Sequence, residues 1–322
     1  DMQIDNETPS TPFTRLIEEA ERVELAYGES PDRIFEVYGV TLSLPTENGA
    51  IKRILGKATN PYRDIFEKGS PGRIGEFSGE LIKRLIAGEL QKYPTDFFIR
   101  NGCTEIAVYN DSRSNIAGFY HKGSRVVYLN AEGIFREDNV GVSGLFNHEL
   151  LHKLERETKA GKLFSSEWNK RFPRRAGLLN VLLGASISLL PEKIRGDIRD
   201  RYEAANFKRL GGKNKYFSQY GSTQPLEDRA EFARGAMTKG IDRDKINYLL
   251  DNLGLLSGRG EIFKSLIDNY YLQAEGSEKD VVARKLSRVM SFLCTVSGGQ
   301  MNGNYWSDFY EGKVKGKYWR ER

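Results

Sequence analysis

The sequence predicts an α+β fold, with a small and mostly antiparallel sheet in the first half of the chain and a largely helical second half. Between residues 104 and 130, apolar and polar residues alternate, which is the period of a β-strand. On both sides of this region, apolar residues recur every three to four positions, as on one face of a helix. We therefore expect helices before and after one group of strands.

The composition is that of an ordinary globular protein. Of the 322 residues, 39% are hydrophobic, and 49 Lys and Arg against 44 Asp and Glu give a formal net charge of +5. Both signs are spread along the chain, so a dedicated nucleic-acid-binding protein is not expected. The two cysteines, Cys103 and Cys294, are too few for a disulfide framework or a cysteine-rich zinc site. The longest apolar run, residues 176–191, is shorter than the roughly 20 residues that span a bilayer, so it predicts a buried helix and no transmembrane segment.

The N-terminal region, residues 1–84, is predicted to be helical. Apolar residues between 11 and 28 fall near helical spacing, and a second helical pattern over 74–94 stops at Pro94. This part of the sequence shows no pattern typical of a catalytic site.

Three strands are predicted in the middle of the chain, with the sequences TEIAVYN (104–110), NIAGFY (115–120) and RVVYLN (125–130). The HKGS segment between the last two is predicted to be a hairpin connection, because it is short and contains glycine. Its histidine, His121, is expected to be an exposed turn residue and not a metal ligand.

The helix predicted after the strands carries His148-Glu149-Leu150-Leu151-His152. Two histidines four positions apart project from nearly the same face of a helix, close enough to bind one metal ion. Glu149 lies about 100° around the helix from His148, where its carboxylate can accept a proton from an attacking water. The alternative interpretation is a solvent-facing polar patch on an amphipathic helix.

A catalytic zinc site needs a third protein ligand, and a carboxylate is expected because the remaining histidine lies in a turn. A helix predicted to start near Pro225 contains Glu227, Asp228 and Glu231. Glu227 and Glu231 are four positions apart, so one can bind the metal while the other supports a ligand histidine. Residue chemistry alone leaves the three carboxylates in competition, and a solvated run of charges is the alternative.

Two motifs of this sequence resemble those of the gluzincin zinc metallopeptidases, in particular anthrax lethal factor and the Pro-Pro endopeptidases. The first is HELLH at 148–152. The second begins with Tyr220-Gly221-Ser222-Thr223 and continues through Glu227 to Ala230-Glu231-Phe232. In this family a Tyr-Gly-x-Thr segment precedes the metal-binding glutamate, and a second acid follows one helical turn later. The spacing from Tyr220 to Glu227 matches the family without a gap.

The resemblance implies a Zn²⁺ ion with three protein ligands: His148, His152 and Glu227. It implies that Glu149 is the general base and that Tyr220 hydrogen-bonds the developing oxyanion. Glu231 is implied to support the ligands without binding the metal itself.

The resemblance also implies a zincin-like catalytic domain over residues 85–290. The helical region 1–84 would precede it, and a tail, 291–322, would pack on it. The strand Arg125–Asn130 is expected to be the edge strand along which an extended peptide or protein substrate pairs. The sequence departs from lethal factor in the long stretch between the two motifs, which is expected to reshape one wall of the cleft.

The function implied by the resemblance is that of a zinc-dependent metalloendopeptidase, secreted as a toxin or effector and delivered to a host cell. One alternative is a catalytically silent zincin-fold binding module, in which zinc only joins two helices. Another alternative is a basic protein that binds nucleic acid or an anionic membrane through RFPRR (171–175) and KRLGGKNK (208–215).

Overall fold

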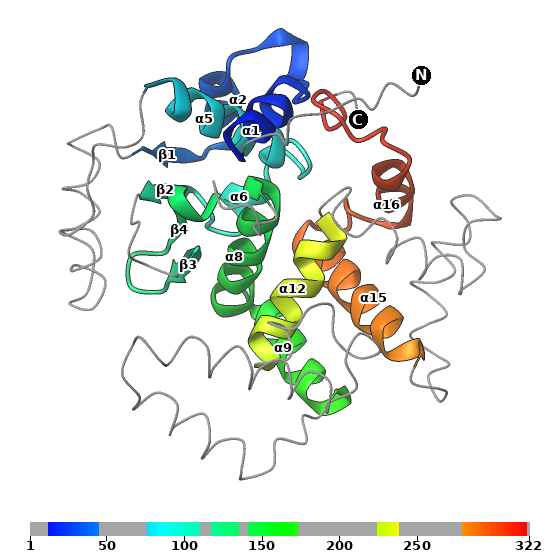
Figure 1. Cartoon of the computed structure of the whole chain (residues 1–322). Coiled ribbons are helices and arrows are strands. Elements are labelled where there is room, and N and C mark those ends of the chain that lie inside the picture. The colour runs from blue at the N-terminus through cyan, green and yellow to red at the C-terminus, as the bar shows by residue number, and fades with distance from the viewer. Residues whose placement is uncertain are drawn as a thin grey trace, which may run out of the picture. The chain divides into compact units, whose positions relative to one another are not determined.

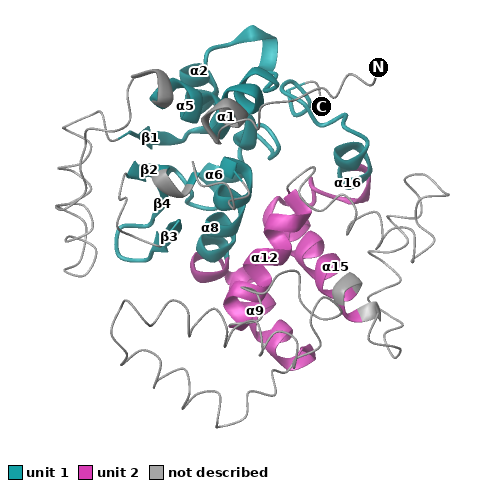
Figure 2. Ribbon diagram, viewed as in Figure 1, with its two compact units in different colours: residues 1–154, 305–322 teal, residues 155–304 magenta. Residues whose placement is uncertain are grey.

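The computed structural model describes residues 12–44, 76–109, 117–134, 141–172, 224–237 and 279–320. These residues have an α+β fold that is mostly helical (Figure 1). The chain divides into two compact units, residues 1–154 with 305–322 and residues 155–304 (Figure 2). The division falls inside one continuous helix, α8 (Gly141–Glu157), so both units contain part of this helix.

The described strands form one mixed sheet in the order β1-β2-β4-β3. They are β1 (Thr41–Ser43), β2 (Glu105–Tyr109), β3 (Gly118–His121) and β4 (Val126–Asn130). β2 runs parallel to β1 and to β4, whereas β3 and β4 form an antiparallel hairpin. The prediction of a mostly antiparallel sheet is therefore wrong. Alternation of apolar residues reveals a strand but not its direction, and the N-terminal region, predicted to be helical, supplies the parallel strand β1.

β4 is an inner strand of this sheet. Val127 pairs with Ile106 of β2 on one side and with Tyr120 of β3 on the other. The prediction that Arg125–Asn130 forms the edge strand is therefore wrong, because β4 already has a hydrogen-bonded neighbour on each side. Among the described strands, β3 is the edge strand next to β4.

The β3–β4 hairpin confirms the predicted HKGS connection. The Arg125 N–H donates to the His121 carbonyl at 2.8 Å, and Arg125 adopts a left-handed backbone conformation with φ 59°. Lys153 of α8 is fully buried and donates to the Arg125 carbonyl. Its ammonium also lies 5.2 Å from the centre of the Tyr120 ring, so the hairpin is tied to α8 by both a hydrogen bond and a cation–π contact.

The other described helices of the first unit are α1 (Pro12–Glu21), a short 3-10 helix (Ala26–Gly28), α2 (Pro31–Tyr38), α5 (Glu76–Leu90), α6 (Phe97–Arg100), α7 (Ala131–Ile134) and all but the first two residues of α16 (Gly303–Tyr310). The limits of α2 follow local rules. The Ser30 side chain accepts from the Arg33 N–H, Pro31 occupies the first position, and Gly39 ends the helix with φ 62°. α5 confirms the helix predicted before Pro94.

Asn147 anchors α8 to the end of α5 and the turn after it. Its Nδ2 donates to Glu89 Oε2 at 2.9 Å, and its Oδ1 accepts from the Tyr93 hydroxyl. Lys92 Nζ donates to both oxygens of Glu89, at 2.6 and 2.7 Å. This buried network holds α8 at the position directly before His148.

The second unit contains α9 (Lys159–Arg171), α12 (Pro225–Met237) and α15 (Lys279–Val296). α12 confirms the helix predicted near Pro225. Phe164 of α9 stacks on Phe292 of α15 with ring centres 4.5 Å apart, and the buried Trp168 contacts Phe232 of α12. Aromatic burial therefore joins the three helices into one core.

The C-terminal residues pack on the N-terminal part of the first unit. Arg320 Nη1 pairs with Glu29 at 2.8 Å, and the Tyr305 hydroxyl donates to the Lys92 carbonyl at 2.8 Å. Gly316 lies so close to the chain at residues 24–26 that a Cβ atom would be 2.6 Å from the Ala26 nitrogen. The sequence predicts that this tail packs on residues 85–290. The described tail contacts Lys92 within that range and also residues 24–29, almost 300 positions earlier.

Some predictions concern residues outside the described ranges. These are the apolar helix at 176–191, the KRLGGKNK segment, Pro173 to Arg175 of RFPRR, and Tyr220. The domain limits at residues 84 and 290 also stay predictions. Within the described ranges, no helix combines the length and the apolar character needed to cross a bilayer.

Candidate metal centre

The HELLH motif lies on the predicted helix, in the middle of α8, but it does not face solvent. The exposed fractions of His148, Glu149 and His152 are 7%, 4% and 7%. A solvent-facing polar patch is therefore excluded. Burying an ionisable side chain reduces the stability of the folded state unless the group is paired or binds a metal. Three such side chains in two consecutive turns therefore indicate interactions that offset this cost.

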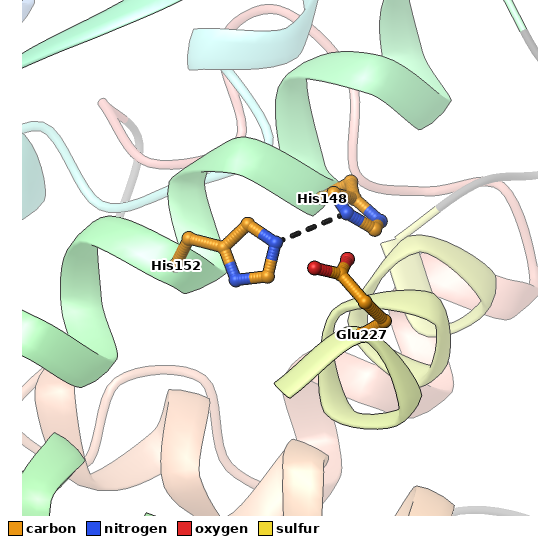
Figure 3. A group of neighbouring side chains, drawn as sticks. All are labelled: His148, His152 and Glu227. Atoms are coloured by element: carbon orange, nitrogen blue, oxygen red, sulfur yellow. Dashed lines mark hydrogen bonds between the residues drawn. The ribbon is translucent and has the colours of Figure 1, made fainter. Parts of the chain in front are cut away.

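The two imidazoles converge on one point. His148 Nε2 and His152 Nε2 are 3.1 Å apart, and the ring planes are nearly perpendicular at 88° (Figure 3). Two nitrogen ligands about 2.0–2.1 Å from a tetrahedral zinc ion lie roughly 3.3 Å apart. The spacing of the two nitrogens therefore fits a shared metal ion.

Glu227 completes a group of three potential ligands. It lies in the first turn of α12, is half-buried, and its carboxylate points toward the imidazoles (Figure 3). One ligand atom from each of His148, His152 and Glu227 lies within 4.8 Å of the other two. In the part of the chain that the structure describes, this is the group of His, Cys, Asp and Glu side chains that can bind a metal ion.

The other two carboxylates of α12 lie in different surroundings. Asp228 is buried and accepts from Lys285 Nζ at 2.6 Å, and burial raises the pKa of Asp228 to about 6 against the opposing effect of the Lys285 charge. Glu231 is also buried and pairs with Arg234 at 3.0 Å. Of the three competing carboxylates, the structure thus groups Glu227 with the histidines. The supporting role of Glu231 stays a prediction.

Glu149 lies beside the edge strand. A Cβ atom at Gly118 of β3 would be 3.1 Å from Glu149 Cγ, so the backbone of β3 passes directly over this side chain. Glu149 therefore follows His148 in sequence, and its side chain lies near Gly118 at the edge of the sheet. Its role as general base stays a prediction, as does that of Tyr220, which lies outside the described residues.

His121 is not part of the group of potential ligands, and it is not exposed. Its exposed fraction is 7%, and its Nδ1 accepts from the Ser124 N–H at 3.2 Å and lies 2.9 Å from Ser124 Oγ. Burial lowers the pKa of His121. The prediction of an exposed turn residue is wrong because His121 is the last residue of β3 and its ring folds back over the turn.

Several side chains that hold the two helices carrying the potential ligands had no signal in the sequence. They are Asn147 and Lys153 on α8, Glu155 at its end, and Arg229 on α12. Each contacts a residue at least 28 positions away. Local spacing in the sequence does not reveal contacts between residues so far apart. A buried charge on a helix indicates only that some partner exists.

Two imidazoles and one carboxylate form a donor set that binds divalent transition metals. The three side chains lie close enough together to bind one such ion. A scan against protein-family models and searches of curated proteins and of solved structures find no match for this chain. The functional assignment therefore rests on the residues of this centre.

Proposed function

We propose that this protein is a zinc-dependent metallopeptidase of the gluzincin type, with His148, His152 and Glu227 as the zinc ligands. The observation that carries the proposal is the convergence of these three side chains beside the buried Glu149. A His₂Glu set is the ligand set of zinc peptidases that hydrolyse amide bonds. Bound at this position, zinc would act as a Lewis acid toward the scissile carbonyl and lower the pKa of water.

Glu149 is the residue proposed to move protons. It directly follows His148 and projects about 100° around the helix from it, so its carboxylate would act on the substrate and not as a metal ligand. It would accept a proton from the attacking water and return that proton to the leaving amine. A site that only joins helices needs no such carboxylate, which speaks against a catalytically silent binding module.

The substrate is proposed to be an extended peptide that pairs with the edge strand β3, in place of the inner strand predicted from the sequence. β3 ends the sheet among the described strands, and Gly118 on it contacts the Glu149 side chain. Backbone pairing along β3 would bring a peptide bond close to the base. The oxyanion role of Tyr220, secretion, and delivery to a host cell stay predictions from the resemblance.

The proposal is tested with the purified protein and two variants, Glu149→Gln and Glu227→Gln. Metal content and Zn²⁺ affinity are measured first, with Fe²⁺ as a competitor because two histidines and one carboxylate also bind that ion. Proteome-derived peptides are then searched for new N-termini. We expect tight zinc binding in the wild type and in Glu149→Gln, weak binding in Glu227→Gln, and cleavage by the wild type alone. Cleavage that persists in Glu149→Gln would refute the mechanism.

A further inference from the structure

Two buried ion pairs directly follow Glu227 in the sequence. Asp228 accepts from Lys285 of α15 at 2.6 Å. Arg229 forms a two-pronged pair with Glu155, in which Nε donates to Oε1 and Nη2 donates to Oε2 at 3.1 Å. The exposed fractions of the Arg229 and Glu155 side chains are only 5% and 1%.

Glu155 lies on the same helix as the two histidines. It follows His152 by three positions and His148 by seven, and residues with these spacings lie on one face of an α-helix. Arg229 therefore attaches the first turns of α12 to the histidine-bearing face of α8, one turn beyond His152. Arg229 Nη1 also donates to Asn169 of α9 at 3.2 Å, which fixes the guanidinium in a third direction.

A zinc ligand must be placed accurately, because a carboxylate oxygen binds zinc at about 2.0–2.2 Å. Glu227 is 75 positions after His152, so the continuity of the chain does little to place it. A planar guanidinium that binds both oxygens of a carboxylate fixes direction as well as distance. A buried ion pair adds little net stability over an apolar pair of similar size, and its best-attested use is to specify one register.

We infer that Arg229 and Glu155 are positioning residues of the metal centre, which hold α12 in the register that presents Glu227 to His148 and His152. The inference rests on the proposed function, since it takes the three residues as ligands. Neither Arg229 nor Glu155 would touch the metal. Their effect is exerted through Glu227, two positions before Arg229 on α12.

The decisive variant replaces both partners, Glu155→Met together with Arg229→Met. This change removes both charges, so no buried charge is left unpaired, and the methionines fill the space. If the pair only stabilised the fold, the double variant should therefore behave like the wild type. The control is Arg288→Met with Glu167→Met, which removes another Arg–Glu pair of the second unit, between α15 and α9, in which Glu167 is half exposed. Arg229→Lys is added because it retains the charge but lacks the planar two-pronged geometry.

Three quantities are measured on each full-length variant. They are the helical signal by circular dichroism, the Zn²⁺ affinity by competition with a chromophoric chelator, and the visible spectrum of the Co²⁺-loaded protein, which depends on coordination geometry. We expect the double variant to keep its helical signal, to bind Zn²⁺ about 10- to 100-fold more weakly than the wild type, and to show an altered Co²⁺ spectrum. The control pair should match the wild type.

The outcomes separate this inference from the proposed function. Weak Zn²⁺ binding by Glu227→Gln, together with wild-type affinity and an unchanged Co²⁺ spectrum in the double variant, would overturn the positioning role and leave the ligand set intact. Equal Zn²⁺ binding by the wild type and Glu227→Gln would overturn the ligand set itself. If the double variant loses its helical signal, Arg229→Lys decides: weaker Zn²⁺ binding supports the positioning role, and wild-type binding refutes it.

Discussion

Gly118 of the edge strand β3 lies directly against the side chain of Glu149 on α8. A methyl group at Gly118 would be 3.1 Å from Glu149 Cγ, 3.0 Å from Leu145 Cδ1 and 2.9 Å from the Tyr128 carbonyl oxygen. Real Cβ atoms essentially never approach a backbone oxygen so closely. The proposed substrate-binding strand and the proposed general base are thus in contact, and the contact requires a glycine at this position.

Replacing Gly118 by alanine should therefore displace either β3 or the Glu149 side chain. We expect peptide cleavage to slow by about 10- to 100-fold, because a shift of about 1 Å at the reacting groups has effects of that size. Zn²⁺ affinity should stay unchanged, since Gly118 and Glu149 are not among the proposed ligands. Overpacking should cost about 1–3 kcal/mol of unfolding free energy.

The matched control for this variant is Gly79→Ala. A Cβ atom at Gly79 would be 3.4 Å from Leu44 Cδ1, which is ordinary van der Waals contact, and Gly79 lies inside helix α5. Alanine there should leave cleavage unchanged and add about 0.5–1 kcal/mol of stability. Equal cleavage rates for the Gly118→Ala and Gly79→Ala proteins would contradict the proposed importance of the contact.

Zinc should stabilise the folded protein against unfolding. At a free Zn²⁺ concentration 100 times the dissociation constant, the free energy of unfolding should rise by about 2.7 kcal/mol, because the ion binds the folded state. A chelator should reverse the effect. The same titration on His152→Ala should give no comparable rise, and a rise of equal size in that variant would place the zinc at another site.

Asn147 should contribute to stability through its buried partners. Replacing it by leucine removes the acceptor of the Tyr93 hydroxyl and a donor to Glu89. We expect a loss of about 2–3 kcal/mol in the free energy of unfolding, measured by urea denaturation, because buried polar groups lose their partners. Thr295→Val, which removes a hydrogen bond to the Ser291 carbonyl on an exposed part of α15, should cost less than about 0.5 kcal/mol.

His121 should make the folded state less stable in acid. Burial lowers its pKa in the folded protein, so the unfolded chain binds a proton more readily as the pH falls below the ordinary value near 6.5. The stabilising contribution is therefore complete above about pH 6.5 and is lost as the pH falls through the lowered pKa. The free energy of unfolding should therefore fall more for the wild type than for His121→Gln when the pH is lowered from 7.5 to 5. A difference independent of pH would show that His121 does not titrate on unfolding.

Local patterns in the sequence were sufficient to predict several parts of the site. The helix that carries His148 and His152, the helix that begins near Pro225, and the β3–β4 hairpin are all present as predicted. These elements depend on spacing of apolar residues, on proline and glycine positions, and on the period of a helix, all of which act over a few residues. The same short-range geometry places two histidines on one face.

Other features depend on contacts between distant residues, and only the tertiary structure reveals them. β4 lies between β2 and β3 because backbone hydrogen bonds, which carry no side-chain signature, select its neighbours. The resemblance already implied Glu227 among the three carboxylates of α12, and the structure groups it with the histidines while Asp228 and Glu231 pair with Lys285 and Arg234. The Arg229–Glu155 pair joins positions 74 apart. Periodicity shows which side of an element is buried, but the identity of its partner is decided by packing across the whole fold.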